Sequence, residues 1–235
     1  MKLRAKPLIT RSTLRDIVLL ASCISAAFLD VGRVGIAVGF SLLAVGCTLH
    51  ILSKGILVRN VVLSDKGIYG FVRHPYYLSN YLIDSSFCVL SGNPYLLLLY
   101  PFLFFWAYGP TLGKEEALLA SRHEAAFARH SAEVPQVFPD RASLSSVKTI
   151  CEEFSKKRIT WKERGRILRF MSLGAFVLLI HEVRADGING IWDMVRPTRL
   201  DYDEFLVASL VVVFYGASRI FLSRAKRTRE RVEMS

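Results

Sequence analysis

The chain has 235 residues, 52% of them hydrophobic, and a mean hydropathy of +0.33, which exceeds the usual range of soluble proteins. A formal charge of +11 would suit a nucleic-acid-binding protein, but the basic residues flank long apolar runs, where membrane topology and anionic lipid headgroups account for them. We therefore expect no nucleic-acid partner. The four cysteines lack CxxC spacing and three lie in apolar runs, so neither a disulfide framework nor a metal site is indicated.

Six apolar runs approach the length of about 20 residues that a bilayer-spanning helix needs. They cover residues 16–32, 34–53, 76–92, 94–112, 166–183 and 205–222. The sequence therefore predicts an all-α, polytopic integral membrane protein with about six transmembrane helices. The basic N-terminus and the first run also fit a signal peptide, but a retained helix is favoured because the run continues to Val31 and a second run follows almost at once.

The distribution of Lys and Arg sets the predicted orientation. With a cytoplasmic N-terminus, 27 of the 31 basic residues lie inside, and the outer segments hold only Arg33, Arg184, Arg196 and Arg199. This is the positive-inside pattern, and it persists when the long segment 114–169 is left out. We expect both termini on the cytoplasmic side, in the plasma or inner membrane of a bacterium or the endoplasmic reticulum of a eukaryote.

The stretch from Gly67 to Ser79, GIYGFVRHPYYLS, places ionisable and aromatic groups at the mouth of the third apolar run. That run is unusually polar, with a stripe at helical spacing formed by Tyr77, Asn80, Tyr81, Asp84 and Cys88. An Asp near the middle of a membrane costs about 2.5–3.5 kcal/mol. Asp84 is therefore expected to face a cavity, or to bond a Ser or Tyr of a neighbouring helix as part of the packing.

A second polar cluster follows the fourth apolar run. Residues 114–129 have an amphipathic helical pattern that predicts a cytoplasmic helix, beginning with Glu115 and Glu116. Because consecutive helical residues point about 100° apart, only one of these glutamates is expected to reach a given spot, while its neighbour faces water or Lys114. The alternative is a solvated helix start in which both carboxylates complement the helix dipole.

Taken together, these stretches resemble the membrane methyltransferases of the isoprenylcysteine carboxyl methyltransferase and phospholipid methyltransferase group. The family pattern has G-P-Y, R-H-P-x-Y-x-G, a hairpin around N-P, E-E-x-x-L and V-P in that order. This chain supplies Gly67-Ile68-Tyr69, Arg73-His74-Pro75-Tyr76-Tyr77, Asn93-Pro94, Glu115-Glu116 with Leu119, and Val134-Pro135 at matching spacing. The resemblance covers about residues 40–140.

The resemblance implies S-adenosylmethionine as the methyl donor, in a pocket completed by the cytoplasmic helix. The residues implied for donor binding are Tyr69, His74, Pro75, Tyr77, Glu115 and Glu116, while Arg73 and Tyr77 are the implied catalytic residues. An imidazole N–H suits the donor's carboxylate and a glutamate suits its ammonium and ribose hydroxyls. Arg73 either grips the donor or orients an anionic acceptor.

The acceptor is expected to be an amphiphile or lipid that enters from the bilayer, with Asn80, Asp84 and His130 as candidate contacts. A carboxylate or phosphate is already nucleophilic at pH 7, whereas an amine must first lose a proton to a base such as His130 or Asp84. No acid–base couple is evident in the sequence, which slightly favours an oxyanion or a phospholipid headgroup.

The chain also departs from the family. Ser79 replaces the last glycine of R-H-P-x-Y-x-G, and His123-Glu124, Phe127 and His130 replace an aromatic-glycine pair and two tyrosines. A catalytically silent protein of the same scaffold, acting in lipid binding or complex assembly, is the alternative hypothesis. We divide the chain into an N-terminal span (1–33), a methyltransferase core (34–140), a cytoplasmic linker (141–165) and a two-span extension (166–235), and leave the oligomeric state open.

Overall fold

The computed structural model describes residues 10–56, 65–193 and 202–233, and within these ranges the chain contains helices and turns but no strand. The elements are α1 (Arg11–Ala26), α2 (Arg33–Ile56), α3 (Ile68–Phe71), α4 (Pro75–Leu90), α5 (Pro94–Glu133), η1 (Ser143–Thr149), η2 (Lys156–Arg158), α6 (Trp161–Asp193) and α7 (Tyr202–Glu233). The predicted all-α class is confirmed. Arg196 and Arg199, assigned to an outer segment, lie outside the described residues, as do residues 1–9 of the N-terminal span.

Three helices are long and apolar enough to cross a membrane, namely α2, α5 and residues Phe205–Thr228 of α7. This finding supports a membrane protein but leaves the predicted six spans unconfirmed. Helices α1 and α4 have 16 residues each, which at 1.5 Å per residue is about 24 Å. That length is somewhat less than the roughly 30 Å hydrocarbon core of a bilayer.

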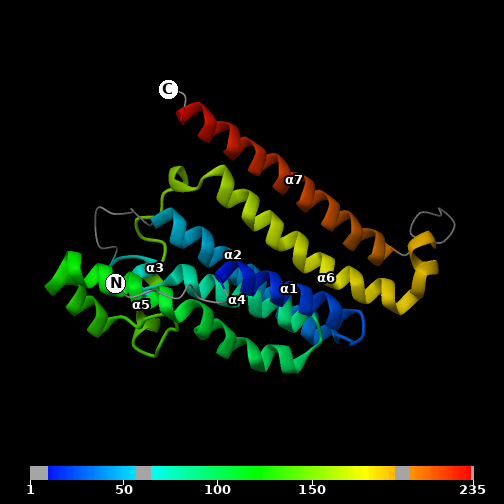
Figure 1. Ribbon diagram of the computed structural model, residues 1–235, viewed down its shortest axis with the longest axis horizontal. Coiled ribbons are helices and arrows are strands. Elements are labelled where there is room, and N and C mark those ends of the chain that lie inside the picture. Colours follow the sequence, from blue (N-terminus) through cyan, green and yellow to red (C-terminus); the bar gives the residue numbers. More distant parts are fainter. Residues whose placement is uncertain (1–9, 57–64, 194–201, 234–235) are drawn as a thin grey trace, which may run out of the picture.

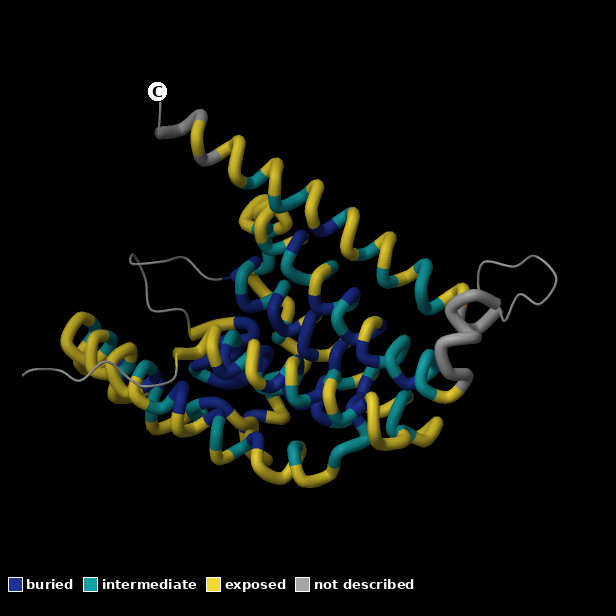
Figure 2. The backbone as a smooth tube through the Cα atoms, turned by 45° about the vertical axis from the view of Figure 1, so that its right-hand side comes forward, coloured by how far each residue is buried: buried dark blue, intermediate teal, exposed yellow. Residues whose placement is uncertain are grey.

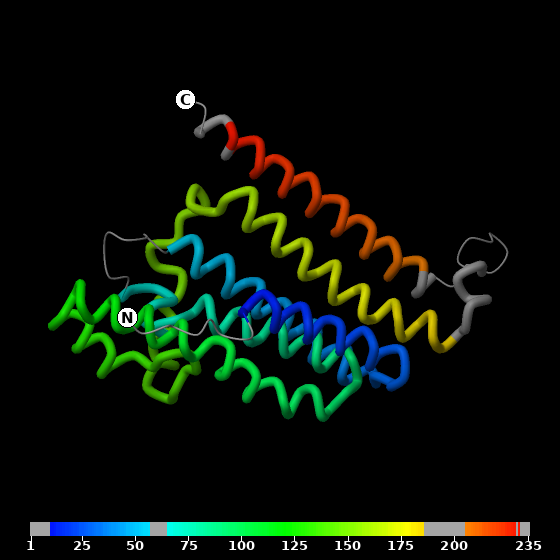
Figure 3. The backbone as a smooth tube through the Cα atoms, viewed as in Figure 1, coloured from blue at the N-terminus to red at the C-terminus, as the bar shows by residue number. Residues whose placement is uncertain are grey.

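Helix α4 forms the centre of the bundle. Twelve of its 16 residues are buried, and it packs closely along α2, with α1, α5 and α6 around it (Figures 1 and 3). Glycines of α2 permit this approach, because a Cβ on Gly46 would lie 3.1 Å from the Ile83 nitrogen and 3.2 Å from the Ser79 carbonyl oxygen. Figure 2 shows buried backbone concentrated here, whereas α7 is mostly exposed.

Helix α5 continues through the predicted end of the fourth span. The sequence predicted a span over 94–112 and a separate cytoplasmic helix over 114–129, but the structure has one element from Pro94 to Glu133, with Pro101 and Pro110 inside it. Asn93 caps its start by accepting from the N–H groups of Tyr95 and Leu96. The break comes at Glu124, whose φ of 25° and ψ of −102° turn the last part of the element.

The segment after α5 fastens the start of α4. The backbone N–H of Arg73 donates to the Pro135 oxygen and that of His74 to the Gln136 oxygen, both at 2.9 Å. An extended segment that begins with Val134-Pro135 therefore pairs with the Arg-His couple, although the two lie far apart in sequence. This pairing fixes the backbone from which the Arg73 and His74 side chains project.

The linker of residues 141–165 closes the end of α2. The Arg158 Nη1 donates to the Ile56 carbonyl oxygen at 2.8 Å and to that of Gly55 at 3.2 Å. The Ser155 N–H also donates to the Gly55 oxygen. These donors satisfy carbonyl groups that the end of a helix leaves without intrahelical partners.

The C-terminal extension joins the bundle through α6. Helix α6 packs against α1, α2 and α4, and within the described part of the chain α7 packs on α6 (Figure 1). His181 Nε2 lies 2.8 Å from the Leu90 carbonyl oxygen at the end of α4. The extension is thus built into the fold, and its first helix is positioned to contribute to a site between the helices.

Candidate active site

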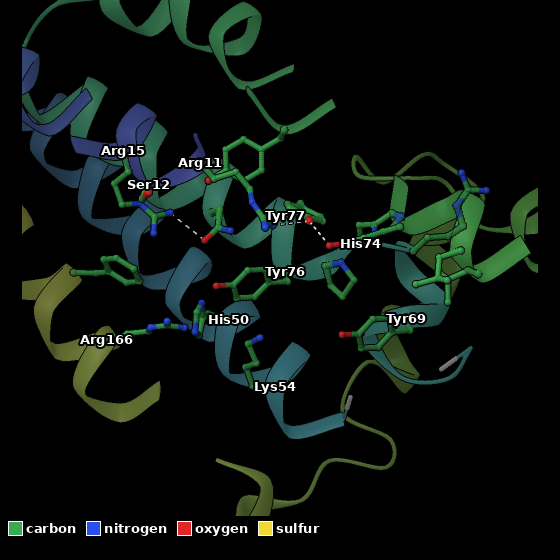
Figure 4. A pocket seen from close by; sticks show the side chains of 18 of the residues that line it. Arg11, Ser12, Arg15, His50, Lys54, Tyr69, His74, Tyr76, Tyr77 and Arg166 are labelled. Carbon is green, nitrogen blue, oxygen red and sulfur yellow. Dashed lines mark hydrogen bonds and ion pairs between the residues drawn. The ribbon is translucent and has the colours of Figure 1, made fainter. Parts of the chain in front are cut away.

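A cavity of about 830 Å³ lies between the ends of α1, α2, α4, α5 and α6, with Tyr69 of α3 at its edge (Figure 4). Its size falls within the range of small-molecule sites. Most of the residues singled out in the sequence line it: Tyr69, Arg73, His74, Pro75, Tyr77, Asn80, Glu115 and His130. The structure therefore brings both polar clusters of the sequence to one place.

The Arg73 guanidinium is engaged through both terminal nitrogens, while its buried Nε has no hydrogen-bond partner among the described residues. Its Nη1 donates to the Ser131 carbonyl oxygen at 2.7 Å, and its Nη2 lies 2.9 Å from Glu116 Oε1. Arg73 thus joins the start of α4 to two positions on α5. In this arrangement it positions Glu116 and the neighbouring backbone, and it does not present a free guanidinium to the cavity.

His74 lies between the two glutamates. Its Nε2 is 3.3 Å from Glu116 Oε1 and its Nδ1 is 3.9 Å from Glu115 Oε2. Burial lowers the pKa of His74 below its ordinary value, although both carboxylates oppose that shift. A neutral imidazole at pH 7 follows, and it keeps one N–H to donate.

The two glutamates aim at different spots, but the expectation that the second would face water or Lys114 is wrong, because both contact the segment of Arg73 to Tyr77. Glu115 accepts from the Tyr77 hydroxyl at 2.7 Å, whereas Glu116 pairs with Arg73. Because the two side chains point about 100° apart around α5, Glu115 reaches Tyr77 on α4 and Glu116 reaches Arg73 just before α4. Their exposure differs, since the Glu115 side chain is 46% exposed and the Glu116 side chain 21%.

Tyr77 links three helices. Its hydroxyl donates to Glu115 on α5 and accepts from Arg11 Nη1 on α1, each at 2.7 Å. Its ring lies edge-on to Tyr108, with the ring centroids 5.5 Å apart. The centre of the cavity is therefore an aromatic and hydrogen-bonded surface whose parts come from distant segments.

Asp84 is buried beneath the cavity rather than lining it. It is fully buried, with Oδ1 2.6 Å from Arg15 Nε and Oδ2 accepting from the Tyr100 hydroxyl at 3.0 Å. Arg15 Nη2 also donates to Asn80 Oδ1 at 3.0 Å. The tyrosine bond fits the packing interpretation of Asp84, but the arginine partner was not foreseen.

Ser79 also lies away from the cavity. It is completely buried, and its backbone faces Gly46 of α2. The replacement of the family's glycine therefore bears on the packing of α2 against α4. Among the other departures, His123 and Phe127 line the cavity, while Glu124 marks the break in α5.

The sequence reasoning missed the opposite wall, to which Arg11, Arg15, His50, Lys54, Arg166 and Arg169 contribute. His50 Nε2 lies 2.8 Å from Glu163 Oε2 across α2 and α6. A histidine near the end of the apolar run 34–53 was the available signal for this wall. No group of three His, Cys, Asp or Glu side chains in the described parts of the chain would hold a metal ion.

Comparisons with known proteins add no relative. The chain matches no protein-family model, no curated protein and no solved structure. The resemblance to membrane methyltransferases thus depends on the motif residues and on the way the fold arranges them.

Proposed function

We propose that the chain is an S-adenosylmethionine-dependent methyltransferase of the membrane that acts on a lipid-like or prenylated amphiphile. The observation that carries the proposal is the meeting of Arg73-His74, Tyr77 and Glu115 on one wall of a single cavity, with Glu116 paired to Arg73 and His74. The Arg-His segment and the glutamates are about 40 positions apart in sequence. In the proposed topology the cavity opens to the cytoplasm, where a soluble donor is present.

The chemistry of this wall suits the donor. On donor binding, the single N–H of a neutral His74 turns from Glu116, which Arg73 also holds, to the donor's carboxylate. Glu115, the more exposed glutamate, offers a carboxylate to the donor's ammonium or ribose hydroxyls. Glu116 is held by Arg73 and His74. We therefore assign direct donor contact to Glu115 and a positioning role to Glu116.

The donor supplies a methyl group on a positively charged sulfur, and this charge disperses as the methyl is transferred. The rings of Tyr77 and Tyr108 exclude water from this part of the cavity, and a dry aromatic wall favours dispersal of charge. The Tyr77 hydroxyl is held by Arg11 and Glu115 and orients the ring. Catalysis then consists mainly of aligning the acceptor with the methyl group.

Titration of the purified protein with S-adenosylmethionine in an uncharged detergent tests the donor site. We expect His74→Ala and Glu115→Gln to weaken binding at least tenfold, because each removes a polar contact to a charged group. Glu152→Ala, at an exposed position in the linker, is the matched control and should bind as wild type. Absence of binding at millimolar donor, or unchanged binding by both site variants, would refute the proposal.

A catalytically silent scaffold is the second candidate, favoured by the ion pair with Arg73 and the hydrogen bond with His74 that already occupy Glu116. Membranes incubated with methyl-labelled donor separate the two functions. Label in lipid, in protein or in a volatile product supports the enzyme and identifies the acceptor class. Donor binding without transfer of label would support the silent scaffold.

A further inference from the structure

The wall of the cavity opposite His74 is formed by α1, α2 and α6. Arg11, Lys54, Arg166 and Arg169 bring four cations to this wall, which we call the basic wall. In Figure 4, Arg166 points towards His50, with Lys54 one turn further along α2. Helix α6 lies beyond the stretch that carries the methyltransferase motifs, so the part of this wall that holds Arg166 and Arg169 belongs to the C-terminal extension.

The charges of the basic wall exceed those available to neutralise them. Glu163 is shared, with His50 at 2.8 Å and Arg166 Nη1 at 3.4 Å. Among the described residues, Asp16 is the one carboxylate that lines this wall. Arg169 is exposed and has no partner among the described residues. By contrast, Arg73 on the opposite wall is paired with Glu116. An excess of positive charge therefore faces the cavity from one side.

Polarity changes in the same direction along two helices of this wall. On α6, Arg166 and Arg169 are followed one turn later by Phe170 and Leu173, and all four line the cavity. On α1, Arg11 and Arg15 are followed by Leu19 on the same face. Arg15 is held rigidly by Asp84 and by the Phe170 ring, 4.8 Å from its Cζ. Along both helices, cations are thus followed one turn later by apolar groups that line the cavity.

We propose that the basic wall binds the oxyanion headgroup and the first methylene groups of an anionic amphiphile. This inference rests on the proposed function, because it makes that amphiphile the acceptor, carrying a phosphate or a carboxylate. Guanidinium groups bind both oxyanions with paired hydrogen bonds, and Phe170, Leu173 and Leu19 give the adjoining chain an apolar contact. Arg11, which bonds the Tyr77 hydroxyl, connects the basic wall to the donor wall.

Binding of four probes to the purified protein in a maltoside detergent tests the proposal. Dodecyl phosphate and dodecanoate carry the two oxyanions, dodecanol has the same chain without a charge, and inorganic phosphate has the charge without the chain. We expect Arg166→Ala/Arg169→Ala to weaken binding of the better dodecyl oxyanion at least tenfold. The single change Arg169→Ala, which removes no contact within the described structure, should weaken it about threefold.

A matched control removes the same charge from outside the cavity. Lys157 and Lys162 are exposed, and Lys157→Ala/Lys162→Ala should bind the dodecyl oxyanion as wild type does. S-adenosylmethionine affinity should be unchanged in every variant. The proposal is overturned if the arginine variants bind the dodecyl oxyanion as tightly as wild type does. It is also overturned if wild type binds dodecanol or inorganic phosphate as tightly as the dodecyl oxyanion.

The same measurements distinguish this inference from the proposed function. Arginine-dependent binding of the dodecyl oxyanion in a protein that does not bind S-adenosylmethionine would support the basic wall and refute the methyltransferase. Donor binding without any binding of either dodecyl oxyanion would refute the basic wall and leave the methyltransferase standing.

Discussion

The buried pair of Arg15 and Asp84 makes the sharpest prediction about stability. Asp84 is fully buried and accepts from Arg15 Nε and from the Tyr100 hydroxyl. Asp84→Ala removes the carboxylate and leaves the Arg15 guanidinium, which is only 20% exposed, without its partner. Removing one member of a buried pair costs about 3–5 kcal/mol, since the remaining charge is left uncompensated.

The other variants of this pair follow from the same contacts. Asp84→Asn keeps the shape and an acceptor oxygen for Arg15 or Tyr100, so we expect about half of that loss. The double change Arg15→Ala/Asp84→Ala should cost less than the sum of the single changes by about 2 kcal/mol or more, because no charge remains unpaired.

Thermal unfolding in detergent, followed by circular dichroism, measures these differences. In a chain of this size 1 kcal/mol shifts Tm by about 2–4 °C, so Asp84→Ala should lower Tm by roughly 10 °C. Additive losses in the double variant, or an Asp84→Ala protein as stable as wild type, would refute a buried ion pair between α1 and α4. Asp16→Ala, which removes an exposed carboxylate next to Arg15 on α1, is the matched control.

Three further predictions concern the contacts of α2. Burial raises the pKa of Glu163, but the hydrogen bond from His50 and the charge of Arg166 lower it from 4.5 to about 2. The ionised Glu163 therefore stabilises the folded protein by at most about 3 kcal/mol above pH 4.5, and this contribution is lost as the pH falls to 2. The Tm difference between wild type and Glu163→Gln should narrow over that pH range. Gly46→Leu should destabilise by about 1–3 kcal/mol because its side chain would overlap Ile83, whereas Gly216→Leu, in open space on α7, should not. Arg158→Ala should lower stability by about 1–3 kcal/mol by leaving carbonyl groups at the end of α2 without donors, with Lys157→Ala as the unaffected control.

Local patterns in the sequence predicted the helices and the polar clusters well. The apolar runs and the polar stripe of the third run are patterns of residues close together in sequence, and α2, α4 and α5 lie where these runs were found. The contact of Arg73 and His74 with Glu115 and Glu116 was approached through a motif whose spacing implied a shared site. The expected partner of the second glutamate was wrong, because Glu115 and Glu116 each contact the segment of Arg73 to Tyr77, where water or Lys114 was expected for one of them.

The remaining contacts join residues that no local pattern connects. Arg15 and Asp84 are 69 residues apart, and His50 and Glu163 are 113 apart. Predicting either pair requires knowing which helices pack against each other, and the apolar runs are too similar to one another to reveal this. The break at Glu124 was also hidden, since neither proline nor glycine marks it.

The position of α6 changes how the division of the chain should be understood. The motif stretch supplies one wall of the cavity, but Arg166, Arg169 and Phe170 supply part of the other. A fragment ending near residue 140 would leave His50 without Glu163 and Arg15 without the Phe170 ring. The cavity therefore depends on the C-terminal extension for its shape as well as its charge. Under the proposed function, the donor contacts lie on the motif wall, and Arg169, unpaired within the described part of the chain, lies on α6. Changes in α6 would then alter the choice of acceptor while leaving the donor site in place.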